Sequence, residues 1–181
     1  MTIQEFKQRR QTFGDPEAYD AAREQFFREH PDCPRPKPIE RLDLIMRVEY
    51  AIDILRGRKK VEIRNSSPFY WKRLHDPDVM AYEDKYWDDE LMRLQMLDFN
   101  DSVRAVETIH FHNYSNSWYL DVKCIDNNTV LLVDDQVAFL REAYGFTEFD
   151  EELEMLNKRK AKERPLYFYF TIGDILGTNL E

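Results

Sequence analysis

Residues 57–64 read Gly57-Arg58-Lys59-Lys60-Val61-Glu62-Ile63-Arg64, and this stretch joins a predicted helix to a predicted strand. Before it, apolar residues recur at the i, i+3, i+4, i+7 spacing of one helix face, at Val48, Ala51, Ile52 and Leu55. Gly57 stands where a C-terminal glycine ends such a helix. After it, Val61 and Ile63 alternate with polar residues, so we expect the strand to bury this pair and to present Glu62 and Arg64 together on its opposite, exposed face. Lys59 then lies just before the strand.

The fixed positions of these residues form the pattern G-x-K-x-x-E-x-R, which resembles the signature of the ASCH domains, small PUA-like β-barrels associated with RNA and nucleotide binding. The layout from about Pro38 to Thr178 is also similar to that family: strand, helix, motif strand and then a β-rich half. The resemblance implies an α+β fold, a PUA-like β-barrel with flanking helices, over residues 38–181.

Two segments fall outside the minimal domain. Residues 1–37 are predicted to form an N-terminal helical extension and a proline-rich connector, with a helix that starts at Asp15 and Pro16 and runs to about His30. Four prolines between residues 31 and 38 then exclude regular helix or sheet pairing. The second segment is an acidic insertion at about residues 76–104, in which apolar residues near 91–96 predict a helix.

The β-rich half contains alternating segments separated by turn residues. We expect paired strands at 106–114 and 118–125, a turn at Asn127-Asn128, a further strand at 129–133 and a last strand at 165–172. Between the last two, a helix is expected at 136–144, ended by Gly145, and Thr147 with Asp150 resembles a capping box that starts another helix.

Composition limits the classes of function. The chain has 181 residues, 43% of them hydrophobic and 14% aromatic, which predicts a single folded domain with additions. No apolar run approaches the roughly 20 residues of a membrane span, and the N-terminus lacks a signal-peptide pattern. Cys33 and Cys124 form no C-x-x-C pair. These features predict a cytoplasmic protein that does not enter a membrane.

The distribution of charge limits the partners. A net charge of −9 argues against a protein that coats nucleic acid, because non-specific affinity comes mainly from neutralising phosphates. Residues 56–73 nevertheless contain seven bases and only one acid, Glu62, whereas residues 76–90 contain seven acids (Asp76, Asp78, Glu83, Asp84, Asp88, Asp89 and Glu90) and one base, Lys85. A focused basic site on an acidic body predicts RNA or a nucleotide-like small molecule as the partner. The N-terminal extension or the acidic insertion could in addition bind a protein partner.

The candidate binding residues are those of the motif and the polar and aromatic residues near it: Lys59, Glu62, Arg64, Asn65, Tyr50 and Tyr70. In this hypothesis Lys59 and Arg64 hold an anionic or carbonyl edge, while Glu62 accepts a hydrogen bond from an exocyclic amine or orients Lys59. Asn65 would supply a neutral donor, and the two tyrosines would line the wall.

An enzyme is the alternative, with Lys59 and Glu62 as catalytic residues. Some proteins similar to ASCH domains are amidohydrolases that deacetylate N4-acetylcytidine, and others bind or cleave RNA. Their amidohydrolase motif usually has threonine where this chain has Glu62. A neighbouring carboxylate also favours the charged form of a lysine, so an anion clamp is a simpler role for Lys59 than that of a nucleophile.

No metal or cofactor is predicted. His110 and His112 share a strand face, and Asp121 is expected to face them from the neighbouring strand, but no third ligand has a recognisable spacing, so they are read as ordinary residues of a polar sheet face. The chain has no glycine-rich phosphate loop, G-x-S-x-G or H-E-x-x-H motif.

Overall fold

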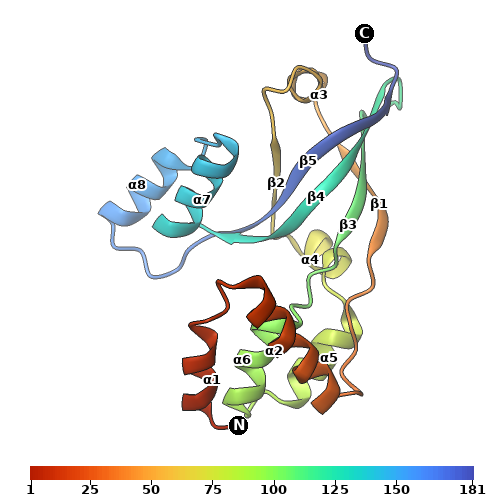
Figure 1. The fold of residues 1–181 in the computed structure, drawn as a ribbon. Coiled ribbons are helices and arrows are strands. Elements are labelled where there is room, and N and C mark those ends of the chain that lie inside the picture. Colours follow the sequence, from red (N-terminus) through yellow and green to blue (C-terminus); the bar gives the residue numbers. More distant parts are fainter. The chain divides into compact units, whose positions relative to one another are not determined.

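The computed structural model describes residues 1–181 and contains eight helices and one five-stranded sheet, a mixed α+β fold (Figure 1). The chain divides into two compact units. A helical unit comprises Met1–Lys37 and Lys72–Arg104, and a sheet unit comprises Pro38–Trp71 and Ala105–Glu181. Helix α4 (Pro68–Leu74) contains the boundary. None of the helices has the length and apolar character needed to cross a membrane.

The helical unit is built from α1 (Ile3–Arg10), α2 (Pro16–Glu29), α5 (Pro77–Lys85) and α6 (Glu90–Phe99). The predicted start of α2 is confirmed, since the Asp15 side chain accepts a hydrogen bond from the Glu17 amide. One buried cluster includes Phe6 and Phe26 from the N-terminal segment and Met96 from the insertion. The N-terminal extension and the insertion, which are far apart in the sequence, therefore share one core.

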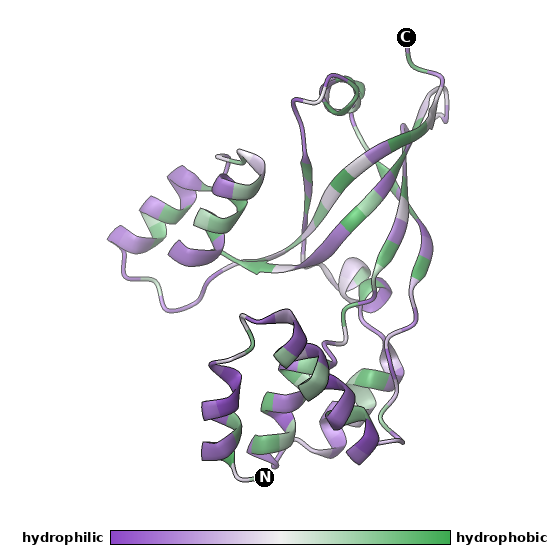
Figure 2. Ribbon diagram, viewed as in Figure 1, coloured by the Kyte–Doolittle hydropathy of each residue, from purple (hydrophilic) through white to green (hydrophobic).

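The sheet has the strand order β1-β3-β4-β5-β2. Its strands are β1 (Ile39–Ile45), β2 (Val61–Asn65), β3 (Val106–His112), β4 (Tyr119–Leu131) and β5 (Leu166–Thr178). β1 pairs with β3 in parallel, and the other pairs are antiparallel. Hydropathy alternates along the central strands, as a sheet with two distinct faces requires (Figure 2). The sheet is open, with β1 and β2 as its edges.

Three helices accompany the sheet: α3 (Val48–Leu55), α7 (Asp134–Tyr144) and α8 (Asp150–Lys158). The last two lie side by side (Figure 1), and their apolar residues Leu140 and Leu153 join one buried cluster with Val61 of β2 and Tyr169 of β5. One face of the motif strand is therefore covered by these helices.

Two predictions for the second half of the chain are wrong. The turn expected at Asn127-Asn128 does not form, because β4 continues through it with register shifts between Asp121 and Asn127. The Asn127 side chain instead accepts a hydrogen bond from the Val106 amide at 2.8 Å, so the residue is used inside the sheet.

The capping box expected at Thr147 and Asp150 is also absent. The N-cap of α8 is Phe149, which makes no side-chain capping bond, and the Asp150 carboxylate instead pairs with Arg141 at 2.6 Å. The end of α7 at Gly145 is confirmed, and this glycine has the left-handed φ of 66°.

Candidate functional site

The turn after α3 places Lys59 at the start of β2. Gly57 has a left-handed φ of 69°, and its amide donates to the Ile54 carbonyl at 2.9 Å. The amides of Arg58 and Lys59 then both donate to the Asp53 carbonyl, at 2.8 and 3.1 Å. These bonds satisfy the end of α3 and fix the path of the chain into the strand.

The carboxylate of Glu62 lies between two cations. Its Oε2 is 3.1 Å from Lys59 Nζ, and its Oε1 is 2.8 Å from Arg64 Nη2. The exposed fractions of the three side chains are 9% for Glu62, 17% for Lys59 and 19% for Arg64. We refer to these three residues as the motif triad. The formal charge of the triad is +1, and each carboxylate oxygen is paired with one cation.

The triad does not lie on an exposed strand face, so this prediction is wrong. Glu62 pairs in register with Phe170, and Arg64 with Phe168, and both phenylalanines are almost fully buried. Paired residues of an antiparallel sheet share a face, so the charged residues lie on an enclosed apolar face. Because helices cover the other face as well, β2 is buried on both sides, and alternation in the sequence cannot identify the solvent side.

Arg64 also connects the two edges of the sheet. Its Nη2 donates to the carbonyl oxygen of Ile45, at the end of β1, at 2.9 Å. Its Nε is buried without a hydrogen-bond partner in the protein. The Arg64 side chain thus links the two edge strands, β2 and β1. These strands are not neighbours in the hydrogen-bonded sheet.

A cavity of about 240 Å³ opens beside Lys59. Its lining residues come from α3, from the motif turn and from the loop after α7: Tyr50, Asp53, Arg58, Lys59, Lys60, Val61, Tyr144, Gly145, Phe146, Thr147 and Glu148. Lys59 Nζ is 5.5 Å from the centroid of the Tyr50 ring, a cation–π distance, and Tyr50 is 45% exposed. Glu62 and Arg64 do not line this cavity and reach it only through Lys59.

The structure therefore brings together four of the six predicted residues, the motif triad and Tyr50. Asn65 is exposed at the end of β2, and Tyr70 lies on α4, where its ring packs edge-to-face on Phe69 at 5.2 Å. Neither lines the cavity. The contribution of residues 144–148 could not be predicted from the sequence, because Gly145 indicates a helix end but not which distant segment that end contacts.

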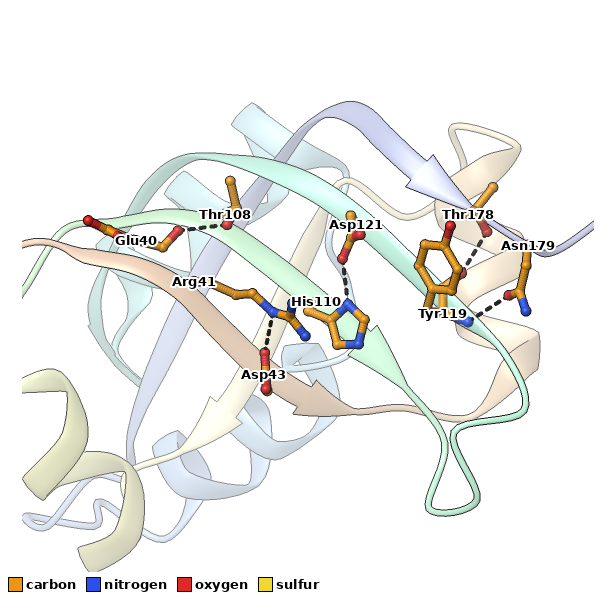
Figure 3. Close-up of polar contacts among 9 residues, drawn as sticks. All are labelled: Glu40, Arg41, Asp43, Thr108, His110, Tyr119, Asp121, Thr178 and Asn179. Carbon is orange, nitrogen blue, oxygen red and sulfur yellow. Dashed lines mark hydrogen bonds and ion pairs between the residues drawn. The ribbon is translucent and has the colours of Figure 1, made fainter.

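His110 and Asp121 lie on a polar face of the sheet, near Arg41 and Asp43 (Figure 3). His110 Nδ1 is 2.5 Å from Asp121 Oδ1 on the neighbouring strand, as predicted, and the His110 ring stacks on Tyr119 at 5.9 Å. His112 Nδ1 donates to the Asn113 carbonyl at 2.9 Å. No group of three or more histidine, cysteine, aspartate or glutamate side chains is arranged to hold a metal ion.

Neighbouring residues of this face are engaged in similar local contacts. Arg41 pairs with Asp43 at 2.7 Å, and the Thr108 hydroxyl donates to the Glu40 carbonyl at 2.6 Å (Figure 3). Such contacts are typical of a solvated sheet surface, and each contributes little to stability. They give no reason to place the functional site here.

Comparisons of the chain with protein-family models, with curated proteins and with solved structures found no match. The class of protein is therefore defined by its own geometry. It is an α+β protein with an open five-stranded sheet, and its candidate site is a small cavity with a fixed lysine and an exposed tyrosine.

Proposed function

We propose that the chain binds a nucleotide, or one base of a short single-stranded RNA, in the cavity beside Lys59, in the manner of an ASCH-like domain. The observation that supports this proposal is the position of Lys59. Its ammonium group is fixed by Glu62 at 3.1 Å and lies next to the exposed ring of Tyr50 at the cavity. A cation and an aromatic face side by side are the groups that single-strand binders use.

Lys59 retains donors for a ligand. An ammonium group has three N–H donors, and the ion pair with Glu62 uses one of them. The others can bond a base carbonyl or a phosphate oxygen. Because Arg64 holds the opposite carboxylate oxygen, Glu62 is itself fixed, so Lys59 is positioned before the ligand arrives and less rotamer entropy is lost on binding.

The size and charge of the cavity favour a small anionic ligand. A volume of about 240 Å³ is below the roughly 300 Å³ at which drug-sized pockets begin, and it suits one base better than a helix. Arg58, Lys59 and Lys60 line it together with Asp53 and Glu148, a net charge of +1 from three cations and two anions. Stacking on an aromatic ring is worth about 1–3 kcal/mol per base.

A PUA-like barrel is part of this proposal. The bond from Arg64 to Ile45 links the two edge strands, which supports a sheet curled toward a barrel, with the motif triad on the enclosed face. In the proposed arrangement the triad forms the polar floor of the site, and Lys59 is its member that meets the ligand.

The enzymatic alternative, an N4-acetylcytidine-type amidohydrolase or a ribonuclease, is less well supported by the geometry. Each oxygen of Glu62 is paired with a cation, and a proton taken from a substrate would remove the negative charge that both ion pairs require. A role for Glu62 in positioning Lys59 requires no such step. Incubating the protein with N4-acetylcytidine and with a short RNA tests for turnover directly, and product formation that Glu62→Gln abolishes would favour the enzyme.

Equilibrium binding of a fluorescent eight-residue oligouridine, and competition by uridine and cytidine monophosphates, test the proposed function. We expect Lys59→Met and Tyr50→Ala each to weaken binding at least tenfold, about 1.4 kcal/mol. Lys123→Met, which removes an exposed lysine from β4, is the matched control and should bind as the wild type does. Equal affinities for the Lys59 and Lys123 variants would contradict the assigned site.

A further inference from the structure

The helical unit has an apolar pocket of its own. A cavity of about 420 Å³ is lined by α6, by Glu83 near the end of α5, and by Tyr86 and Trp87 between the two helices. Met92 and Met96 are buried in the core of the unit and also line this cavity. Trp87 and Leu97 line it as well, yet these two large apolar side chains are 65% and 63% exposed.

The surroundings of this pocket are acidic. Glu83 and Glu90 line the pocket. Asp84 and Asp88, which lie between them in the sequence, are exposed to solvent. The pKa of Glu83 is raised, first by burial and then by the negative charges of Asp101 and Asp84. Glu90 is paired with Lys7 of α1 at 3.3 Å, whereas Glu83, Asp84 and Asp88 form no ion pair within the protein. A positively charged partner would therefore meet unpaired carboxylates near the pocket.

We propose that this pocket is a docking site for a basic amphipathic helix of a partner protein, which inserts a large apolar side chain over Met92 and Met96 between Trp87 and Leu97. Methionine side chains are flexible and polarisable, which suits a floor that adapts to an inserted group. An amphipathic helix supplies apolar anchors on one face and lysine or arginine at the flanks, which complement the acids around the pocket.

Charge distinguishes this partner from other occupants. Residues 76–90 contain seven acids and one base, and this excess of negative charge repels RNA and an anionic membrane surface. Arg93, whose guanidinium lies 5.5 Å from the Trp87 ring centroid, is the one basic residue that lines the pocket, beside the two acids Glu83 and Glu90. A second copy of this chain is the other candidate, because its basic run at residues 158–164 follows the exposed Met155.

The test uses the full chain and a synthetic 16-residue helical peptide with leucines at i, i+3, i+4 and i+7 and lysines at the other positions, measured by calorimetry at 0.1 M salt. Two control peptides each keep one of its two properties. One keeps the apolar face and has glutamates in place of the lysines, and the other keeps the positive charge and has serines in place of the leucines. We expect binding of the lysine–leucine peptide and at least tenfold weaker binding of both controls. Equal binding of the serine peptide would overturn the proposal, since attraction would then need no apolar anchor.

Variants locate the contact. Leu97→Ser and Trp87→Ala are expected to weaken peptide binding at least tenfold, and their helical circular dichroism should match the wild type because both side chains are largely exposed. Met155→Ser removes an exposed apolar side chain from the other unit and is the matched control. Unchanged affinity in Leu97→Ser would refute the site.

Sedimentation equilibrium tests the competing occupant. The proposal expects a monomer over the concentration range of the peptide titration. If the wild type self-associates and Leu97→Ser does not, the pocket is occupied by a second copy, and the partner-helix proposal is wrong. Oligouridine binding depends on Lys59, whereas peptide binding depends on Leu97. The proposed function and the proposed docking site can therefore fail independently of each other.

Discussion

Replacing Glu62 with glutamine tests the motif triad as a structural unit. Glutamine keeps the shape of the side chain and removes its charge, so Lys59 and Arg64, which are only 17% and 19% exposed, would remain as two uncompensated cations. Removing one partner of a buried ion pair is destabilising by about 3–5 kcal/mol. Because both cations keep some contact with solvent, we expect a loss of about 3 kcal/mol, a large share of the 5–15 kcal/mol that is typical of a domain.

Urea unfolding followed by tryptophan fluorescence measures this loss. Trp118 is buried in the sheet unit and Trp87 lies in the helical unit, so a background with Trp71→Phe and Trp87→Phe reports on the sheet unit alone. The midpoint should fall while the m-value stays constant, as expected when stability changes and the exposed surface does not. Glu148→Gln, an exposed carboxylate beside the same cavity, is the control and should change stability by less than about 0.5 kcal/mol.

Replacing the whole triad separates stability from function. Apolar replacement of a complete buried ion network is often neutral or stabilising, so Lys59→Met combined with Glu62→Leu and Arg64→Met should recover most of the lost stability and still fail to bind oligouridine. A loss below about 1 kcal/mol for Glu62→Gln alone is the range of an exposed ion pair. That result would refute the inference that the carboxylate is enclosed between two cations.

Three further predictions concern other positions. Gly145→Ala should destabilise the sheet unit by about 1–2 kcal/mol in urea unfolding, because its φ of 66° is left-handed and no atom within 4 Å obstructs an added Cβ, which leaves backbone strain as the cause. Glu83 has a raised pKa in the folded state, so its proton is held more tightly there than in the unfolded chain. Stability of the helical unit should therefore fall as pH rises above 4.5, and Glu83→Gln should flatten that slope in denaturation curves followed by helical circular dichroism. Burial raises the pKa of Cys33 to about 11 and that of Cys124 to about 12, so neither thiol should react with Ellman's reagent at pH 8 before unfolding, and a fast native reaction would contradict their burial.

Local signals in the sequence predicted local structure well. The left-handed glycines Gly57 and Gly145 end their helices where expected, and Asp15 caps α2. Each of these features depends on backbone conformations and hydrogen bonds within a few residues, so the neighbouring sequence is sufficient to indicate it.

Features that depend on distant contacts were not predicted. The helical unit combines residues 1–37 with residues 72–104. Nothing in the sequence of either segment indicates that it packs against the other. Asn127 has the composition of a turn, yet its side chain bonds the Val106 amide from within a long strand. Tertiary contacts override local preference at such positions.

The spacing of the motif explains how Lys59, Glu62 and Arg64 come together on one face of β2. The sequence alone does not identify that face. Two residues separate Lys59 from Glu62 across the strand entrance, and one separates Glu62 from Arg64 along the strand, so both cations reach opposite oxygens of the same carboxylate. A shift of the acid by one residue would place it at Ile63, whose register partner is Tyr169 in the apolar cluster beneath α7 and α8. Because Ile63 is half-buried against this cluster, a carboxylate there would lose part of its hydration among apolar side chains, which is unfavourable. Glu62 therefore occupies the position of β2 at which one acid can fix a lysine at the cavity and an arginine at the opposite sheet edge.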